Sequence, residues 1–174
     1  NVRVPASFVN DVRSLIAACH AGSKRVIEMF EEYGQKELLK YIDHNIRLSK
    51  SALSERIEKL PKRTFHSYDW VEYDGRGTPE LYDVSCEMTP SRGKLIFKFS
   101  GAEQVTAFIN AGPSAVAGVG VITPLLCMLA YDIPFNEGIW ECVEIDVGKS
   151  GTLVNPRVPA PVTNAHMETG VRLG

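Results

Sequence analysis

The chain has 174 residues, of which 44% are apolar and 23% are charged, a composition typical of a globular protein that builds its own core. Its formal net charge of −2 is too small to indicate binding to nucleic acid or to an anionic membrane. The charge is uneven, because residues 1–63 carry 12 basic and 8 acidic side chains whereas residues 64–174 carry 7 and 13. We therefore expect two segments, a helical one over 1–63 and an α+β one over 64–174.

Apolar residues in the first segment recur at steps of three and four, the spacing of amphipathic helices. This spacing predicts one helix over Ser7–Tyr33, ended by Gly34, and a second over Gln35–Leu60, ended by Pro61. The charged residues between the apolar positions form the outer, solvated face. The N-terminal segment is thus expected to be a hairpin of two long helices.

Alternation of apolar and polar residues predicts strands in the second segment. The run 65–73 is rich in aromatic residues and ends at the turn signal Asp74-Gly75, and residues 82–88 and 95–99 alternate on either side of a turn at 89–93. A further strand is expected over 140–147. The expected fold class is therefore α+β, with the helical hairpin followed by an antiparallel sheet.

Residues 104–131 contain no Asp, Glu, Lys, Arg or His, so a transmembrane helix has to be weighed. Glycine, proline and asparagine interrupt the run, and no cluster of Lys or Arg flanks it, which disfavours a membrane span. The run instead predicts a fully buried helix rich in glycine and alanine, starting near Pro113. Residues 132–138 and 155–161 are expected to be loops, and Thr163 or Asn164 is expected to cap a final helix.

The four cysteines, Cys19, Cys86, Cys127 and Cys142, have neither CxxC spacing nor a histidine at zinc-finger distance. We expect four reduced, mostly buried thiols in a cytoplasmic protein, with a single disulfide as the alternative. No secretory signal is visible. The chain begins at an asparagine and stops directly after a charged, helix-like run, so we expect both ends to be cuts in a longer chain.

Known catalytic motifs do not fit this chain. The tripeptide Gly148-Lys149-Ser150 lacks the first glycine of a phosphate-binding loop, and His166 and Glu168 are spaced too closely to share a metal ion on one helix face. No metal site is expected in this chain. Ser100 lacks the GxSxG elbow of serine hydrolases. What remains is a set of polar loop residues, either turn and cap residues or a site: Ser100, Gln104, Asn110, Asn136, Glu137, Asn155 and Glu168.

Several of these loops carry, in order and in register, the motifs of a known family: Phe99-Ser100-Gly101, Gln104, Ile109-Asn110, Ile133–Gly138, Gly151–Pro156, Pro159–Val162 and Glu168-Thr169, preceded by Asn1–Pro5, Asp11–Arg13 and Glu32–Gly34. The chain resembles the hydantoinase B/oxoprolinase family over nearly its whole length. It departs from the family at Lys98, where an acidic residue is usual, at Ala102, where Ser or Thr is usual, and at His166, where Asn is common. The reversed charge at Lys98 leans toward a divergent member such as a ketone carboxylase.

The resemblance implies a function that the residues alone do not. B-type subunits of this family act on a cyclic amide, such as a hydantoin, oxoproline or lactam, after an A-type, actin-like ATPase partner has phosphorylated it with ATP. Alternatives are an ATP-dependent ketone carboxylase of the acetone or acetophenone type, and a non-catalytic scaffold module of such a complex.

The resemblance also implies a small-molecule substrate and a divalent metal bound outside this segment. Because the two long helices and the glycine-rich helix lack an obvious full cover, we further expect association, with other copies of the B-type subunit among the partners. The candidate catalytic residues are Ser100, Asn136, Glu137, Asn155 and Glu168. The resemblance implies that this segment shapes the site and that its loops contribute polar contacts, so it assigns no individual role to these residues.

Overall fold

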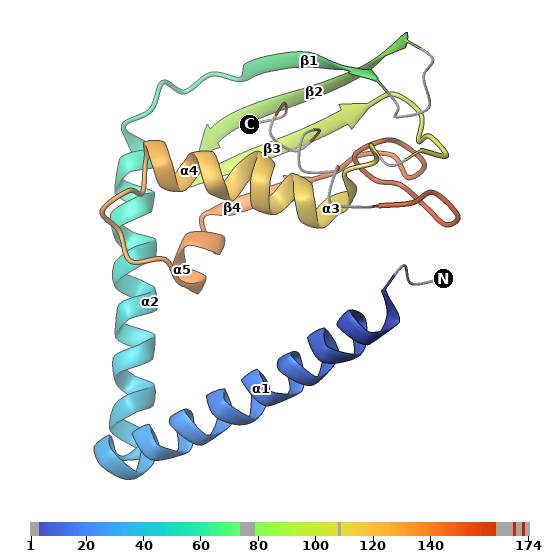
Figure 1. Cartoon of the computed structure of the whole chain (residues 1–174). Helices are drawn as coiled ribbons and strands as arrows, with labels where there is room; N and C mark the ends of the chain where they lie inside the picture. Colours follow the sequence, from blue (N-terminus) through green and yellow to red (C-terminus); the bar gives the residue numbers. More distant parts are fainter. Residues whose placement is uncertain (1–3, 74–78, 108, 163–168, 170–171, 173–174) are drawn as a thin grey trace. The chain divides into compact units, whose positions relative to one another are not determined.

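The computed structural model describes residues 4–73, 79–107, 109–162, 169 and 172, and the chain divides into two compact units, Asn1–His44 and Asn45–Gly174. The first unit contains helix α1 (Pro5–Tyr33) and the beginning of helix α2 (Gln35–Glu58), separated by Gly34 (Figure 1). The two long helices are thus confirmed. No residue of α1 is buried.

The second unit is built on a four-stranded sheet of order β1-β2-β3-β4. Strands β1 (Phe65–Tyr73), β2 (Pro79–Ser91) and β3 (Lys94–Gly101) are antiparallel, whereas β4 (Val143–Asp146) lies parallel to β3. The α+β class is confirmed, but the sheet is mixed rather than antiparallel. The chain reaches β4 only after a helical crossover, the connection that parallel neighbours require.

The β2–β3 hairpin turns more tightly than the sequence pattern indicates. Pro90 pairs with Leu95 and Ser91 with Lys94, so only Arg92 and Gly93 form the turn. Both have positive φ, 50° and 73°, as a two-residue turn matched to the twist of the strands requires. Gly93 also lies against Ser54 of α2, where a Cβ atom would collide with the hydroxyl.

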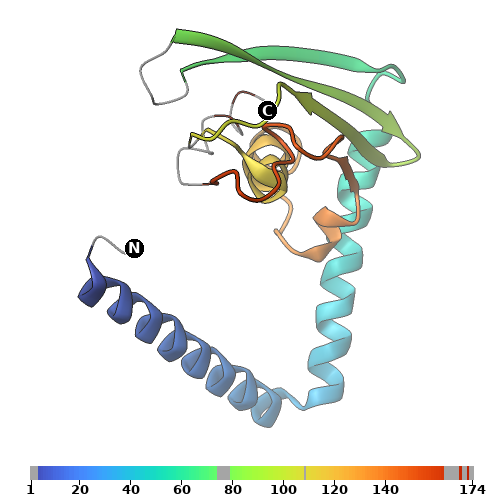
Figure 2. The ribbon, with the colours of Figure 1, turned by 90° about the vertical axis from the view of Figure 1, so that its right-hand side faces the viewer.

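A helical layer covers one face of the sheet (Figure 2). It consists of three consecutive segments, α3 (Gly112–Ala115), the π-helix η1 (Val116–Ile122) and α4 (Thr123–Met128). The expected helix is therefore present but is neither uniformly α-helical nor fully buried, since Met128 is 76% exposed. The layer buries one side only, because it has a sheet on that side and solvent on the other.

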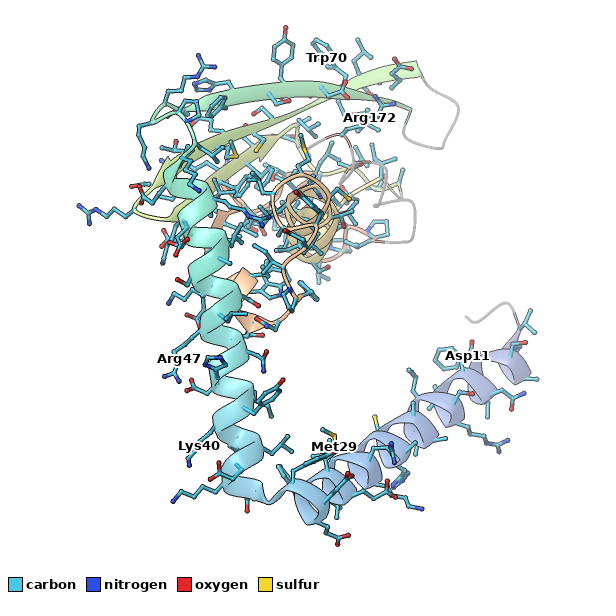
Figure 3. All side chains as sticks on the ribbon, turned by 90° about the vertical axis from the view of Figure 1, so that its left-hand side faces the viewer. Asp11, Met29, Lys40, Arg47, Trp70 and Arg172 are labelled. Carbon is cyan, nitrogen blue, oxygen red and sulfur yellow. The ribbon has the colours of Figure 1, made fainter. Side chains whose placement is uncertain are left out.

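The core lies between this layer, the inner face of the sheet and the C-terminal half of α2. Its members are apolar side chains from all three parts, including Leu53, Ile57, Val84, Cys86, Phe97, Phe99, Val121 and Leu125. The alternation of these residues along β2 and β3 leaves the opposite face exposed. On that face the rings of Tyr68 and Trp70 meet edge to face, with their centroids 5.2 Å apart; Trp70 is labelled in Figure 3.

Other expectations differ from the structure in detail. Trp140 belongs to the short helix α5 (Glu137–Trp140) rather than to a strand, because Asn136 caps a helix there. All four cysteines are free, but Cys19 and Cys127 are exposed rather than buried. The turn at 74–75 and the final helix at 163–164 lie outside the described residues. The helix-to-strand change between α2 and β1 falls near residue 63, and the domain boundary expected there stays a prediction.

Candidate functional site

Three of the seven polar candidates, Gln104, Asn110 and Asn155, lie in the loops at the carboxyl end of β3. The segment after β3 pairs with the loop 148–156 through the bonds Leu153 N–H to Ala102 O, 3.0 Å, and Gln104 N–H to Gly151 O, 2.9 Å. Leu153 and Val154 are fully buried, so this loop is anchored in the core. We call the loops 101–112, 148–157 and 158–162 the β3-end loops.

The Gln104 side chain holds two of these loops together. Its Oε1 accepts a hydrogen bond from the Arg157 amide at 2.7 Å, and its Nε2 donates to the Arg157 carbonyl at 3.2 Å. A side-chain amide thus replaces the two hydrogen bonds that a neighbouring strand would form. This pairing explains why an amide, rather than a carboxylate, occupies the position, since a carboxylate could not donate.

Asn110 is the most completely bonded polar side chain of the β3-end loops. It is 0% exposed. Its Oδ1 accepts from the Val105 amide at 2.9 Å, and its Nδ2 lies 2.8, 3.1 and 2.9 Å from the carbonyls of Val105, Ala107 and Pro161. Buried polar groups need such partners, and Asn110 therefore fixes the path of the loop rather than offering a free group to a substrate.

Asn155 fixes the turn that follows β4. Its Nδ2 donates to the carbonyl of Gly148 at 2.9 Å, while Asp146 Oδ1 accepts from the Gly148 amide at 2.9 Å. Gly148 has φ 69°, and a Cβ atom there would lie 2.6 Å from the carbonyl oxygen of Phe99. The glycine is required both by its conformation and by this close approach, and Asn155 holds it in place.

Ser100 is exposed on the outer face of the sheet, where its hydroxyl lies 2.7 Å from that of Ser85. Within the described residues, no histidine or carboxylate is hydrogen-bonded to Ser100. The nearest titratable pair on the same face, His66 and Glu87, is an ion pair of its own at 3.5 Å. Ser100 therefore lacks the base that a serine nucleophile needs.

Asn136 and Glu137 lie in a different part of the unit, where α5 meets α2. Asn136 Oδ1 accepts from the Gly138 amide at 2.9 Å and Nδ2 donates to Ser49 Oγ at 2.9 Å, while Ser49 Oγ donates to the Pro134 carbonyl at 2.9 Å. A Cβ atom on Gly138 would collide with the backbone of α2 at Ile46 and lie 2.8 Å from the amide nitrogen of Lys50. Asn136 is thus a helix cap that also fastens α5 to α2.

The structure therefore does not gather the five candidate residues in one site. Ser100 and Asn155 lie at the carboxyl end of β3, and Asn136 and Glu137 lie at the α2–α5 contact. Glu168 lies outside the described residues. The Glu137 carboxylate is exposed and has no hydrogen bond or ion pair with the described part of the chain, which leaves it free for a ligand or partner.

Sequence reasoning did not predict a groove of about 540 Å³ between the inner face of the sheet and α4. It is lined almost entirely by apolar side chains, among them Leu60, Phe65, Met88, Phe97, Leu125 and Met128. The one titratable thiol in it, Cys86, has its pKa raised to about 11, first by burial and then by Glu87. The groove can hold apolar groups but offers little acid–base chemistry. The alternating apolar residues of β2 and β3 were its only sequence signal.

The family's divalent metal finds no ligand set in the described part of the chain, since no group of three or more His, Cys, Asp or Glu side chains is placed to hold an ion there. In the same described ranges, none of the helices combines the length and the hydropathy needed to cross a membrane.

Two ion pairs join α2 to the residues on either side of α5. Arg56 lies 2.6 Å from Asp132, and Lys50 lies 2.6 Å from Glu141.

Comparison with known proteins agrees with this architecture. The family model for hydantoinase B/oxoprolinase matches residues 1–174. The chain is 28% identical to the caprolactamase beta subunit of Pseudomonas jessenii over 94% of its own length and 28% of that subunit, and 25% identical to the 5-oxoprolinase of Saccharomyces cerevisiae over 95% of its length and 13% of that enzyme.

Two solved structures share the fold. The ATP-dependent caprolactamase of Pseudomonas jessenii matches with a TM-score of 0.76 at 26% identity, covering 94% of this chain and 28% of that one. A nucleotide-free acetone carboxylase matches with a TM-score of 0.73 at 20% identity, covering 94% and 23%, a likeness of fold alone.

An α+β unit with a mixed sheet and one helical layer is thus the fold that this chain shares with part of each of these two larger structures. The chain belongs to the hydantoinase B/oxoprolinase family. It spans less than a third of the length of the relatives named above.

Proposed function

We propose that this chain is part of the B-type subunit of an ATP-dependent amidohydrolase that opens a cyclic amide. The observation that carries the proposal is the joint match to the caprolactamase beta subunit, in sequence over 94% of the chain and in fold with a TM-score of 0.76. In this proposal an A-type partner uses ATP to phosphorylate the amide oxygen, which turns a poor electrophile into one with a good leaving group.

Within that enzyme, this segment acts as scaffold for the site rather than as the source of the reacting groups. Three facts support this role. The side-chain amides of Gln104, Asn110, Asn136 and Asn155 are hydrogen-bonded within the protein, mostly to backbone. Among the described residues, no base is hydrogen-bonded to Ser100, and no set of metal ligands is present. The divalent metal implied by the family would be held by residues outside this chain. Glu137 is the candidate whose carboxylate is free.

The direct test combines the full-length subunit that contains this chain with its A-type partner. Caprolactam, 5-oxoproline and hydantoin serve as probes, and phosphate release from ATP and ring opening are measured together. The proposal predicts ATP hydrolysis that depends on one of these amides. Hydrolysis that instead requires a ketone and bicarbonate would support the carboxylase alternative, for which the lysine at position 98 was the sequence argument.

The scaffold role is tested in the same assay. Ser100→Ala is expected to leave kcat within about twofold of the wild type, whereas loss of a true nucleophile costs several orders of magnitude. Ser150→Ala, another exposed serine on these loops, is the matched control. A collapse of kcat in the Ser100 variant alone would make Ser100 a catalytic residue and contradict the proposal.

A further inference from the structure

Helix α1 carries an apolar stripe of which no residue is buried. The stripe repeats with alternating steps of four and three residues across the whole helix: Phe8, Val12, Leu15, Cys19, Gly22, Val26, Met29 and Tyr33. This is the heptad spacing of helices that pair with other helices. Figure 3 shows Asp11 and Met29 at opposite parts of α1; by the heptad spacing Met29 belongs to the stripe and Asp11 flanks it.

The size of the stripe suits a stable interface. Eight apolar side chains on or beside it are 39–67% exposed: Phe8, Val9, Val12, Leu15, Ile16, Val26, Met29 and Tyr33. They offer roughly 800 Å² per helix, so a pair of such helices would remove roughly 1,600 Å² from water, which is the size of a standard protein–protein interface. Most of the stability of a helix in a protein comes from the packing of its apolar face against a partner.

The order of side-chain sizes along the stripe indicates what the partner is. The largest side chains stand at the two ends and the smallest at the centre: Phe8 and Tyr33 are outermost, Val12, Leu15, Val26 and Met29 are intermediate, and Cys19 and Gly22 are central. An antiparallel pairing of α1 with its own copy places Phe8 in one layer with Tyr33, Val12 with Met29, Leu15 with Val26 and Cys19 with Gly22. A two-fold interface needs this kind of self-complementarity.

We propose that α1 pairs antiparallel with α1 of a second copy of this chain, about a two-fold axis between Cys19 and Gly22. The small central residues let the two helices approach most closely there, and the aromatic residues close the two ends. One flank of the pair gains apolar contacts, since Val9 of one copy faces Phe30 of the other. The other flank places Asp11 opposite Glu32, a like-charge contact that weakens the pair modestly.

A parallel pair is less favourable on the same residues. It would place Gly22 opposite Gly22 and leave a void in the seam, and it would stack Phe8 on Phe8. It would also place Cys19 beside Cys19, close enough for a disulfide. In the antiparallel pair the two Cys19 residues are displaced along the axis, and each faces Gly22 instead.

The first test is the mass of the 174-residue chain by sedimentation equilibrium over a range of concentrations. We expect a dimer, a monomeric Leu15→Glu variant and a dimeric Ile27→Glu variant, because Ile27 is equally exposed but lies on the opposite side of α1. Circular dichroism verifies that both variants keep their helices. A monomeric wild type, or a dimer that survives Leu15→Glu, overturns the proposal and assigns the stripe to another partner.

The second test fixes the direction of the pair. Glu32→Lys turns the Asp11 contact into two ion pairs per dimer and should tighten association about five- to tenfold at low salt, as should Asp11→Lys. The double variant restores a like-charge contact and should return to wild-type affinity. Oxidation should cross-link a Gly22→Cys, Cys127→Ala variant through Cys19, but not the Cys127→Ala chain alone. A Cys19–Cys19 disulfide in that control contradicts the antiparallel arrangement.

Discussion

Replacing Asn110 with alanine should destabilise the second unit far more than its position in a loop suggests. The change leaves the Val105 amide without an acceptor and removes the donor from the carbonyls of Val105, Ala107 and Pro161. A buried donor without a partner costs about 1–3 kcal/mol, and the carbonyls and the small cavity add to it. We expect a total loss of about 3 kcal/mol.

The matched comparison is Gln104→Ala. This side chain also bonds to a backbone amide and a carbonyl, but it is only half-buried, so water can replace it and the cost should be about 1 kcal/mol or less. Urea unfolding followed by tryptophan fluorescence reports on the second unit alone, because Trp70 and Trp140 are the chain's two tryptophans. A loss of about 3 kcal/mol in the free energy of unfolding should lower the urea midpoint by about 1–2 M.

The result that would refute this reasoning is an equal midpoint shift in the two variants. Such a result would mean that the β3-end loop relaxes to expose the Val105 amide to water, so that the burial of Asn110 carries no penalty. A changed m value in the Asn110 variant would instead indicate loss of two-state unfolding, and the midpoint could then not be converted into a free energy.

Three further predictions concern other contacts of the second unit. Asp132→Asn should lower the stability of the unit above about pH 4 and leave it unchanged in acid: a hydrogen bond from Arg56 lowers the pKa of Asp132, so the stabilisation by this carboxylate is present above about pH 4. This stabilisation is lost as pH falls through the lowered pKa, so the thermal unfolding temperatures of the wild type and the variant should become equal in acid. Gly138→Ala should cost about 1–3 kcal/mol by overpacking against α2. Cys86, whose pKa is raised to about 11 by burial, should resist alkylation at pH 8 until the protein unfolds.

Each of these predictions has a control in the same chain. Added salt should shrink the effect of Asp132→Asn, because Asp132 is solvent-exposed and Arg56 is only partly buried. Gly118→Ala, at a helical glycine with open space around it, should be neutral or slightly stabilising, and an equal loss in both glycine variants would refute the packing argument. Exposed Cys127 should alkylate readily under conditions that spare Cys86, as followed by mass spectrometry.

The elements that the sequence predicts well are those whose cause is local. The spacing of apolar residues is enough to place α1 and α2 within two residues at their ends, and the alternation along 82–88 and 95–99 is enough to place the hairpin. The pairing of β4 with β3 in parallel was not predictable, since it depends on the crossover between them. Helix α5 was missed because its cap, Asn136, uses a partner on α2, 87 residues away along the chain.

The candidate site illustrates the same limit. The family motifs drew attention to these polar residues, but they did not indicate what the side chains do. Asn110 stands between apolar residues, Ile109 and Ala111, and that is a local sign of a buried, fully bonded amide. For Gln104 and Asn155 no such sign exists, because their partners, Arg157 and Gly148, are brought near only by the fold.

The π-helix η1 has a consequence for how this helical layer can change in evolution. A π-helix accommodates extra residues within a helical run while the flanking α-helices keep their places. The segment Val116–Ile122 ends just before Pro124, whose ring nitrogen cannot donate a hydrogen bond, and the amide and hydroxyl of Thr123 both donate to the carbonyl of Gly118. Relatives that lack one residue between positions 116 and 122 would convert this stretch to α-helix without displacing α4 from the groove. Length differences in this family should therefore be tolerated inside the helix, and not only in its loops.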